Sequence, residues 1–483
     1  MGKPRGSFGG PSVWLITALA CVLSGCSLAP HYHPPAAAVP VQFIEAKAPL
    51  FASGAAPASA LWHSFADPAL DRLIVIALTN NKTLAQVRAQ VNEARALRGL
   101  EFYALLPTVT GSASRMRSSP SARDPFVPPT IGKTTVFKAG FDASWEWDVF
   151  GGARSADRAA RAQQAAAEAS LDAARQSVIA EVAQAYFGLR AQQERLRLQR
   201  RSVQNLQESL RVLQARRDAG RGTDLDVERA RALALSTDAR VPQIEAVATQ
   251  NEQRLAVLTA LPIDALRQEL GPPKPLPRMP QMITVGAPAD WLQRRPDVRV
   301  AERRLAAQTA LVGVEAADFL PHLTLVGGFG WTAQLANDIG RSVAQRSQFG
   351  PALSWSFLDV GRVRQRVLAS RARAAGALAT YEDTVLRALE ETEDALAYYR
   401  TANEAAVTLA EAAQAARTAL DLAQKRFDAG ASDTLTVLDA ERTELDLQDQ
   451  LASAELQRAT ALAALYKALV GDFAKSASNG ATP

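Results

Sequence analysis

The stretch RFDAGASDTLTVLDAERTEL, residues 426–445, has a near copy in the first half of the chain, RRDAGRGTDLDVERARALAL, residues 216–235. The two stretches align at an offset of 210 residues, so the glycines of their Asp-Ala-Gly turns, Gly220 and Gly430, coincide. Each stretch is typical of two helical segments joined at that turn, where glycine supplies the left-handed conformation that ends the first helix. A repeated turn predicts that the two halves of the chain share one architecture.

The repeat extends beyond the turns. Trp145 and Trp355 keep the offset of 210, whereas the Leu-Pro stops at Pro107 and Pro321 differ by 214. A duplication with a short insertion in one loop explains both offsets. The chain therefore consists of two equivalent halves.

Long helices are expected in both halves, because the chain is rich in Ala, Leu, Arg, Gln and Glu, which are strong helix formers. The proline-free runs 153–217 and 362–427 contain 65 and 66 residues. Each predicts a helix roughly 98 Å long at 1.5 Å per residue. Pro242 is expected to kink one of the shorter helices. Those shorter helices are predicted at 67–104, 225–260, 296–318 and 435–470.

Two strand-like runs lie between the Pro stop and the repeated Trp of each half. The clearest, 136–149, alternates apolar and polar residues strictly, and its copy places Phe349, Leu353, Trp355 and Phe357 on one face. The weaker runs are 108–116 and 322–333. This alternation fits a soluble sandwich with its apolar face buried in protein, or a transmembrane barrel with that face against lipid. Because the few strands of one chain cannot close a barrel, the second interpretation requires several copies of the chain.

The first 25 residues have the features of a secretory signal peptide, with basic residues before an apolar stretch at 13–23. The stretch ends in Leu-Ser-Gly-Cys26, which resembles the bacterial lipobox, whose cysteine is acylated and becomes the first mature residue. By the same resemblance, Ser27 favours the outer membrane. An ordinary signal peptide with a chance cysteine is the alternative. Cleavage would remove Cys21, the only other cysteine, and so excludes an intrachain disulfide.

Several stretches closely resemble the TolC-like outer membrane factors of Gram-negative efflux systems, and within them the NodT-type outer membrane lipoproteins of resistance-nodulation-division pumps. The resemblance is carried by residues 61–96 and 285–330, by both Asp-Ala-Gly turns and by ALYKAL at 464–469. The most specific of these stretches is APADWLQRRPDVRVAERRL. Taken together, the resemblance covers nearly the whole mature chain. The C-terminal ALVGDF departs from the Gly-rich, Trp-ended form of many relatives, which affects only the packing of the tail.

The resemblance implies a mixed fold class, all-α plus β-barrel. An internally duplicated chain would supply four transmembrane β-strands and long periplasmic helices, completed as a homotrimer with a 12-strand β-barrel and a 12-helix α-barrel. The implied organisation is a lipoprotein signal peptide (1–25), a lipid-anchored Pro/Ala-rich tether (26–60), a first structural repeat (61–270), a Pro-rich linker (271–289), a second repeat (290–470) and a flexible C-terminal tail (471–483).

The implied function is that of an outer-membrane exit channel of a tripartite efflux pump. The channel would passively conduct substrates delivered by a periplasmic adaptor (membrane fusion) protein and an inner-membrane resistance-nodulation-division pump. The protein would lie in the cell outer membrane, anchored in lipid through Cys26, with a large periplasmic part. A periplasmic helical scaffold or adaptor without a pore is the alternative. The sequence names neither the exported substrate nor the cognate pump.

By the same resemblance, the second-repeat turn is the inner one, and Leu435, Asp439 and Arg442 stand where family members close the periplasmic aperture. Their spacings of four and three place them on one helix face. In a trimer, copies of Leu435 would form an apolar constriction and copies of Asp439 a carboxylate ring, while Arg442 would bridge to a neighbouring chain. An ordinary surface ion pair between Asp439 and Arg442 is the alternative. The residues expected to dock the adaptor or pump are Asp218, Ala219, Gly220, Asp428, Ala429 and Gly430.

The sequence predicts no enzyme, no cofactor and no metal site. The four histidines are His31, His33, His63 and His322. His31 and His33 could bind a metal in the tether, but two ligands without nearby cysteines or carboxylates do not make a typical site. Residues 132–134 resemble the end of a phosphate-binding loop, but a valine stands at position 127, where that motif needs glycine. No dense basic run interleaved with aromatics is present, which argues against a nucleic-acid partner.

Overall fold

The computed structural model describes residues 30–36, 39–54, 61–121, 123, 132–271, 273–277 and 279–469. The predicted signal peptide, Cys26 and the predicted tail from 470 onward lie outside these residues. The chain forms two compact units, each built from both sequence repeats. The strand unit comprises Val91–Ala167 and Ala301–Tyr381, with the described residues 30–35. The helical unit comprises Ala36–Gln90, Glu168–Val300 and the described chain from residue 382 to residue 469.

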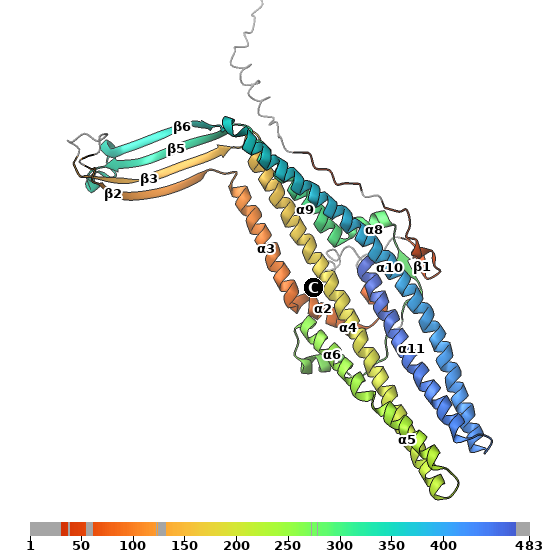
Figure 1. The fold of residues 1–483 in the computed structure, drawn as a ribbon. Helices are drawn as coiled ribbons and strands as arrows, with labels where there is room; N and C mark the ends of the chain where they lie inside the picture. Colours follow the sequence, from red (N-terminus) through yellow and green to blue (C-terminus); the bar gives the residue numbers. More distant parts are fainter. Residues whose placement is uncertain are drawn as a thin grey trace, which may run out of the picture. The chain divides into compact units, whose positions relative to one another are not determined.

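The strand unit contains one antiparallel four-stranded sheet in the order β2-β3-β5-β6 (Figure 1). The central pair, β3 and β5, joins the two repeats. The strands are β2 (Thr108–Ser118), β3 (Thr134–Trp147), β5 (His322–Ala333) and β6 (Gln345–Ser354). All four predicted strands are therefore present.

The last strand is shorter than its alternation predicts. β6 ends at Ser354, so Trp355 and Phe357 lie beyond it. The chain instead enters a 3-10 helix, η5 (Phe357–Asp359), and the Trp355 indole donates to the carbonyl of Phe319 at 3.2 Å. Trp355 is thus held by the end of a helix rather than by a neighbouring strand.

The register of the sheet sorts its side chains into an apolar and a polar face. Phe141 pairs with Phe329, and the odd-numbered residues of all four strands share one face. Among the apolar residues of that face, Phe141, Leu353 and Phe349 are 60%, 69% and 80% exposed in the single chain. The protein does not bury this face within itself, as expected for a surface that meets lipid rather than the core of a soluble sandwich. The even-numbered face carries Lys138, Asp142, Glu146, Arg346 and Gln348.

The described residues of the first repeat form six α-helices, and two predicted helices are each divided. The helix expected at 67–104 breaks at Asn81, whose side chain accepts from the backbone N–H of Leu84 and donates to the carbonyl of Leu258. The helix expected at 225–260 breaks before Pro242, because proline lacks the N–H that continues a helix. The helices are α2 (Pro68–Asn80), α3 (Lys82–Tyr103), α4 (Gly152–Asp218), α5 (Asp224–Asp238), α6 (Val241–Thr259) and α7 (Ile263–Leu270).

The second repeat supplies α8 (Pro288–Arg294), α9 (Pro296–Ala317), α10 (Val360–Asp428) and α11 (Thr434–Leu469). The two unusually long helices predicted from the proline-free runs, α4 and α10, are confirmed at 67 and 69 residues. Within the described part of the chain, no helix combines enough length and apolar character to cross a membrane.

Part of the segment expected to be an extended tether is packed against the helical unit. Phe43 is 1% exposed, and its ring lies edge-on to Trp291 with a centroid separation of 5.5 Å. The backbone N–H groups of Ile44 and Glu45 donate to the Glu393 carboxylate at 2.8 and 3.1 Å. A short strand that follows, β1 (Phe51–Ser53), pairs in parallel with β4 (Ile283–Val285), which lies in the predicted inter-repeat linker.

Candidate functional site at the helical turns

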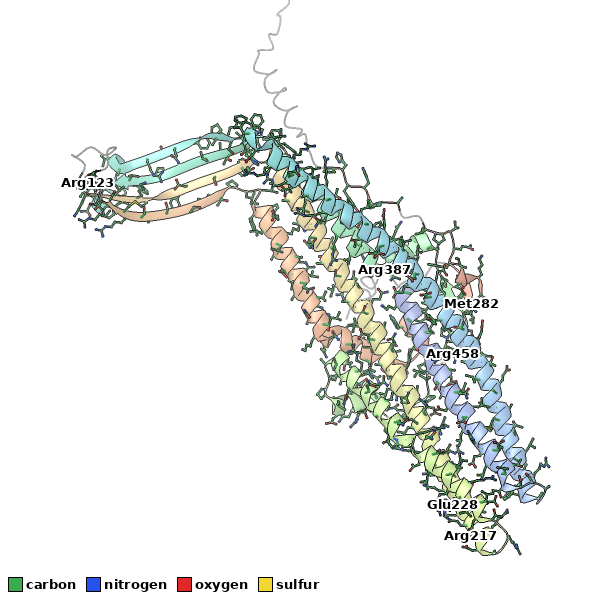
Figure 2. The ribbon with its side chains drawn as sticks, in the orientation of Figure 1. Arg123, Arg217, Glu228, Met282, Arg387 and Arg458 are labelled. Atoms are coloured by element: carbon green, nitrogen blue, oxygen red, sulfur yellow. The ribbon has the colours of Figure 1, made fainter. Side chains whose placement is uncertain are left out.

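Both Asp-Ala-Gly turns close with the same backbone hydrogen bonds. The N–H of Gly220 donates to the carbonyl of Arg217 at 2.8 Å, and that of Gly430 to the carbonyl of Phe427 at 2.9 Å. The two glycines have φ of 69° and 73°, which glycine adopts without a steric penalty. The turns are Schellman closures, and the predicted left-handed glycine caps are confirmed. Arg217 is labelled at the first turn in Figure 2.

The helices that leave the turns begin at side-chain caps. At the start of α5, Thr223 and Asp226 form a reciprocal capping box. At the start of α11, the Asp433 carboxylate accepts from the backbone N–H of Thr436 at 3.0 Å and from its hydroxyl at 2.6 Å. These hydrogen bonds lower the pKa of Asp433. The cap fixes where α11 begins, and therefore which way its first side chains face.

Leu435, Asp439 and Arg442 are exposed on one face of α11, as their spacing predicts. Together with Arg229 of α5 and Arg240, which caps the start of α6, they line a groove of about 490 Å³. Within the described part of the chain, neither Asp439 nor Arg442 takes part in an ion pair. The alternative interpretation, an ion pair between these two side chains, is not realised within the protomer. Both charges are available to groups outside it.

The opposite face of α11 is buried in the helical unit. Glu441 and Glu444 are only 8% and 9% exposed. Burial, reinforced by the nearby Glu444, raises the pKa of Glu441 to about 7. This pair was not predicted from the sequence, although Leu438, Glu441 and Glu444 are spaced three residues apart and therefore follow one side of the helix. Leu438 belongs to a hydrophobic cluster with Leu213, Val227 and Ala230.

A buried arginine, Arg295, holds the start of the second repeat and is 6% exposed. Its guanidinium pairs with Asp297 at 2.8 Å and with Glu391, and its Cζ lies 5.2 Å from the ring centre of Trp291. Burial favours a higher pKa for Glu391, but the positive charge of Arg295 outweighs it and leaves that pKa below its usual value. Arg295, Asp297 and Trp291 lie in the run that carries the family resemblance, and the structure gives them a packing role.

His322, at the start of β5, lies between two carboxylates. Its Nδ1 is 2.7 Å from Glu146 Oε1, and its Nε2 is 3.6 Å from Asp318 Oδ1. Because Arg366 also pairs with Asp318 at 2.6 Å, this group is an ion-pair network. Among the residues that the structure describes, no set of three or more His, Cys, Asp or Glu side chains is placed to hold a metal ion.

A family model described as "Outer membrane efflux protein" matches residues 73–261 and 287–471, one segment in each repeat. The chain belongs to the outer membrane efflux protein family. Outer membrane protein OprJ of Pseudomonas aeruginosa is 32% identical over 94% of this chain and 95% of its own length. Nodulation protein T of Rhizobium leguminosarum is 32% identical over 94% and 92%. The solved outer-membrane channel OprN superposes with a TM-score of 0.87 at 36% identity, covering 93% of this chain and all of that one.

As a member of the outer membrane efflux protein family, the protein is an outer-membrane exit channel of an efflux pump, with a large helical part in the periplasm. The family consists of transport channels and is not an enzyme family. The predicted fold class is confirmed, and the trimeric barrel arrangement is that of the family. The channel function replaces the alternative of a poreless scaffold.

Proposed function

We propose that the protein is a passive duct whose periplasmic opening is gated by the second-repeat turn and docked through both turns. The observation that carries the proposal is the exposed row of Leu435, Asp439 and Arg442, whose two charges have no ion-pair partner within the described protomer. Relatives named for toluene efflux and for pyoverdine export are 32% and 33% identical to this chain. The proposal therefore concerns a conduit and no particular substrate.

The gate follows from the chemistry of this row when three chains surround one axis. Three copies of Leu435 narrow the opening with apolar side chains. Three copies of Asp439 form a carboxylate ring that attracts cations. Arg442 reaches a carboxylate of the neighbouring chain, and this intermolecular pair holds the turns together.

The docking surface comprises the turn residues, which are exposed in the protomer. A periplasmic adaptor (membrane fusion) protein and an inner-membrane resistance-nodulation-division pump are the proposed partners. The two turns share a backbone conformation, so an adaptor with repeated contact elements meets equivalent surfaces at both. The proposed contact residues are Asp218, Ala219, Gly220, Asp428, Ala429 and Gly430. Lipid attached to Cys26 is proposed as an additional membrane anchor.

The test is the single-channel conductance of the purified trimer in planar bilayers. Replacing Asp439→Ala together with Arg442→Ala is expected to raise conductance and to sensitise cells to large antibiotics. The matched control is Asp421→Ala with Lys425→Ala, which removes an exposed pair of opposite charges from α10 whose atoms lie 2.5 Å apart. Unchanged conductance in a correctly assembled Asp439/Arg442 variant would remove the gate proposal and leave the channel function in place.

A further inference from the structure

The two turns are joined by a contact between an arginine of one repeat and an aromatic ring of the other. The Cζ atom of Arg216, near the end of α4, lies 4.3 Å from the ring centre of Phe427, near the end of α10. Both side chains are half-buried. A guanidinium at this distance over an aromatic face is attracted by the negative charge density of the ring.

The contact depends on a difference between the two repeats. The offset of 210 places Phe427 where the first repeat has Arg217. Arg217 pairs with Asp218 at 2.6 Å and with Asp224 at 3.5 Å, so its charge is used within its own turn. Arg216 has no ion-pair partner among the described residues, and its guanidinium is directed to the other repeat.

The contact lies next to the elements that carry the proposed gate. Leu213, one helical turn before Arg216, belongs to the hydrophobic cluster that receives Leu438 of α11. Leu438 directly precedes Asp439 and lies one turn from Leu435. When the second-repeat turn moves away from the first, the Arg216–Phe427 contact breaks and Leu438 loses its apolar neighbours.

We infer that Arg216 and Phe427 form a latch that holds the second-repeat turn against the first and thereby keeps the channel opening narrow. Both are positioning residues, because they act on the gate through the placement of α10 and α11. The inference rests on the proposed gate.

The first experiment compares Phe427→Leu and Arg216→Gln with the wild-type trimer in planar bilayers. Each variant is expected to increase the fraction of time in the high-conductance state about three- to tenfold, the range that a half-exposed cation–ring contact supports. Arg217→Gln is the matched control, since it removes the same charge one residue away, where the ion pairs stay within one turn. Equal opening in Arg217→Gln, or none in Phe427→Leu, overturns the latch.

Conservative variants separate the contact from general packing. Phe427→Tyr keeps an aromatic ring and Arg216→Lys keeps a cation, so both are expected to stay near the wild-type closed fraction. The double variant Phe427→Leu with Arg216→Gln is expected to open no further than either single variant, because both remove the same interaction. Full additivity of the two single effects overturns the latch.

Hydrogen exchange of the purified trimer distinguishes failure of the latch from failure of the gate. Backbone amides of residues 428–440 are expected to exchange faster in Phe427→Leu and to be unchanged in Arg217→Gln. Unchanged exchange in Phe427→Leu overturns the latch whatever the conductance. Faster exchange without a conductance change also overturns it, because the contact then does not control the opening. The Asp439→Ala, Arg442→Ala channel keeps the latch and tests the gate alone.

Discussion

Trp145 and Trp355, which the sequence repeat pairs at an offset of 210, make matching hydrogen bonds. The indole Nε1 of Trp145 donates to the carbonyl of Leu105 at 2.9 Å, and that of Trp355 donates to the carbonyl of Phe319 at 3.2 Å. Leu105 and Phe319 themselves follow the second offset, 214. In both repeats, therefore, one indole ties the exit from the sheet to the end of the helix that leads into it.

Trp145→Phe removes this donor and keeps an aromatic ring. The expected loss is about 1 kcal/mol per protomer, the usual contribution of one hydrogen bond. Thermal dissociation of the trimer, followed by electrophoresis, measures the effect. Trp147→Phe is the control, because Trp147 is 45% exposed and its indole has no hydrogen-bond partner among the described residues. Equal shifts in the two variants would contradict a role for the Trp145 hydrogen bond.

Arg295→Gln is expected to destabilise the helical unit by about 1–3 kcal/mol, because Asp297 and Glu391 lose their hydrogen bonds to a buried cation but are themselves partly exposed. Glu391→Gln should cost less, since Arg295 then retains Asp297. Chemical denaturation of the detergent-solubilised protein gives both values. The neighbouring Arg294 is exposed, so Arg294→Gln should be close to neutral. A loss of similar size in the Arg294 variant would show that charge in this region, rather than the buried pair, matters.

Glu441 predicts a pH-dependent stability. Its pKa is raised from 4.5 to about 7 in the folded protein, so the folded state binds the proton of Glu441 more tightly than the unfolded chain does. The contribution of this proton to the free energy of unfolding is complete below pH 4.5 and is lost as pH rises through about 7. The loss at alkaline pH is on the order of 3 kcal/mol per protomer. Glu441→Gln should therefore melt higher than wild type at pH 8 and near wild type at pH 5.

The control for Glu441 is Glu411→Gln, which changes an exposed carboxylate on α10. Thermal unfolding at a series of pH values should show the same pH dependence in this control as in wild type. An unaltered pH dependence in Glu441→Gln would mean that Glu441 is not the titrating group.

The orientation of the sheet predicts which loops face the outside of the cell. Residues 117–135 and 334–347 each connect two paired strands, β2 with β3 and β5 with β6. An epitope inserted near Pro128, which lies outside the described residues, should bind antibody on intact cells. Detection only after permeabilisation would invert the topology. An epitope in the Asp-Ala-Gly turn at Gly430 is the periplasmic control.

Cys26→Ser is expected to abolish metabolic labelling with palmitate, because the lipobox resemblance makes this thiol the acylation site. Outer-membrane fractionation of the same variant should still show assembled trimer, since the strands themselves hold the membrane. Label retained by the serine variant would contradict acylation at Cys26 and with it the lipoprotein interpretation.

Most of the secondary structure and the internal duplication could be predicted from the sequence alone. The ends of α4 and α10 were predicted to within one or two residues, because proline-free runs and a left-handed glycine act through local backbone geometry. The faces of β3 were equally predictable, since alternation along a strand follows from its pleat. The shared face of Leu435, Asp439 and Arg442 was predictable from helical spacing alone.

Tertiary structure decided the features that depend on residues far apart in the chain. The break at Asn81 is stabilised by the carbonyl of Leu258, and the tether is held by Glu393 through Ile44. The burial of Glu441 and the contact of Arg216 with Phe427 arise only when the turns of the two repeats pack together. These contacts could not be predicted from local sequence patterns, because each forms between segments that are brought together only in the folded protein.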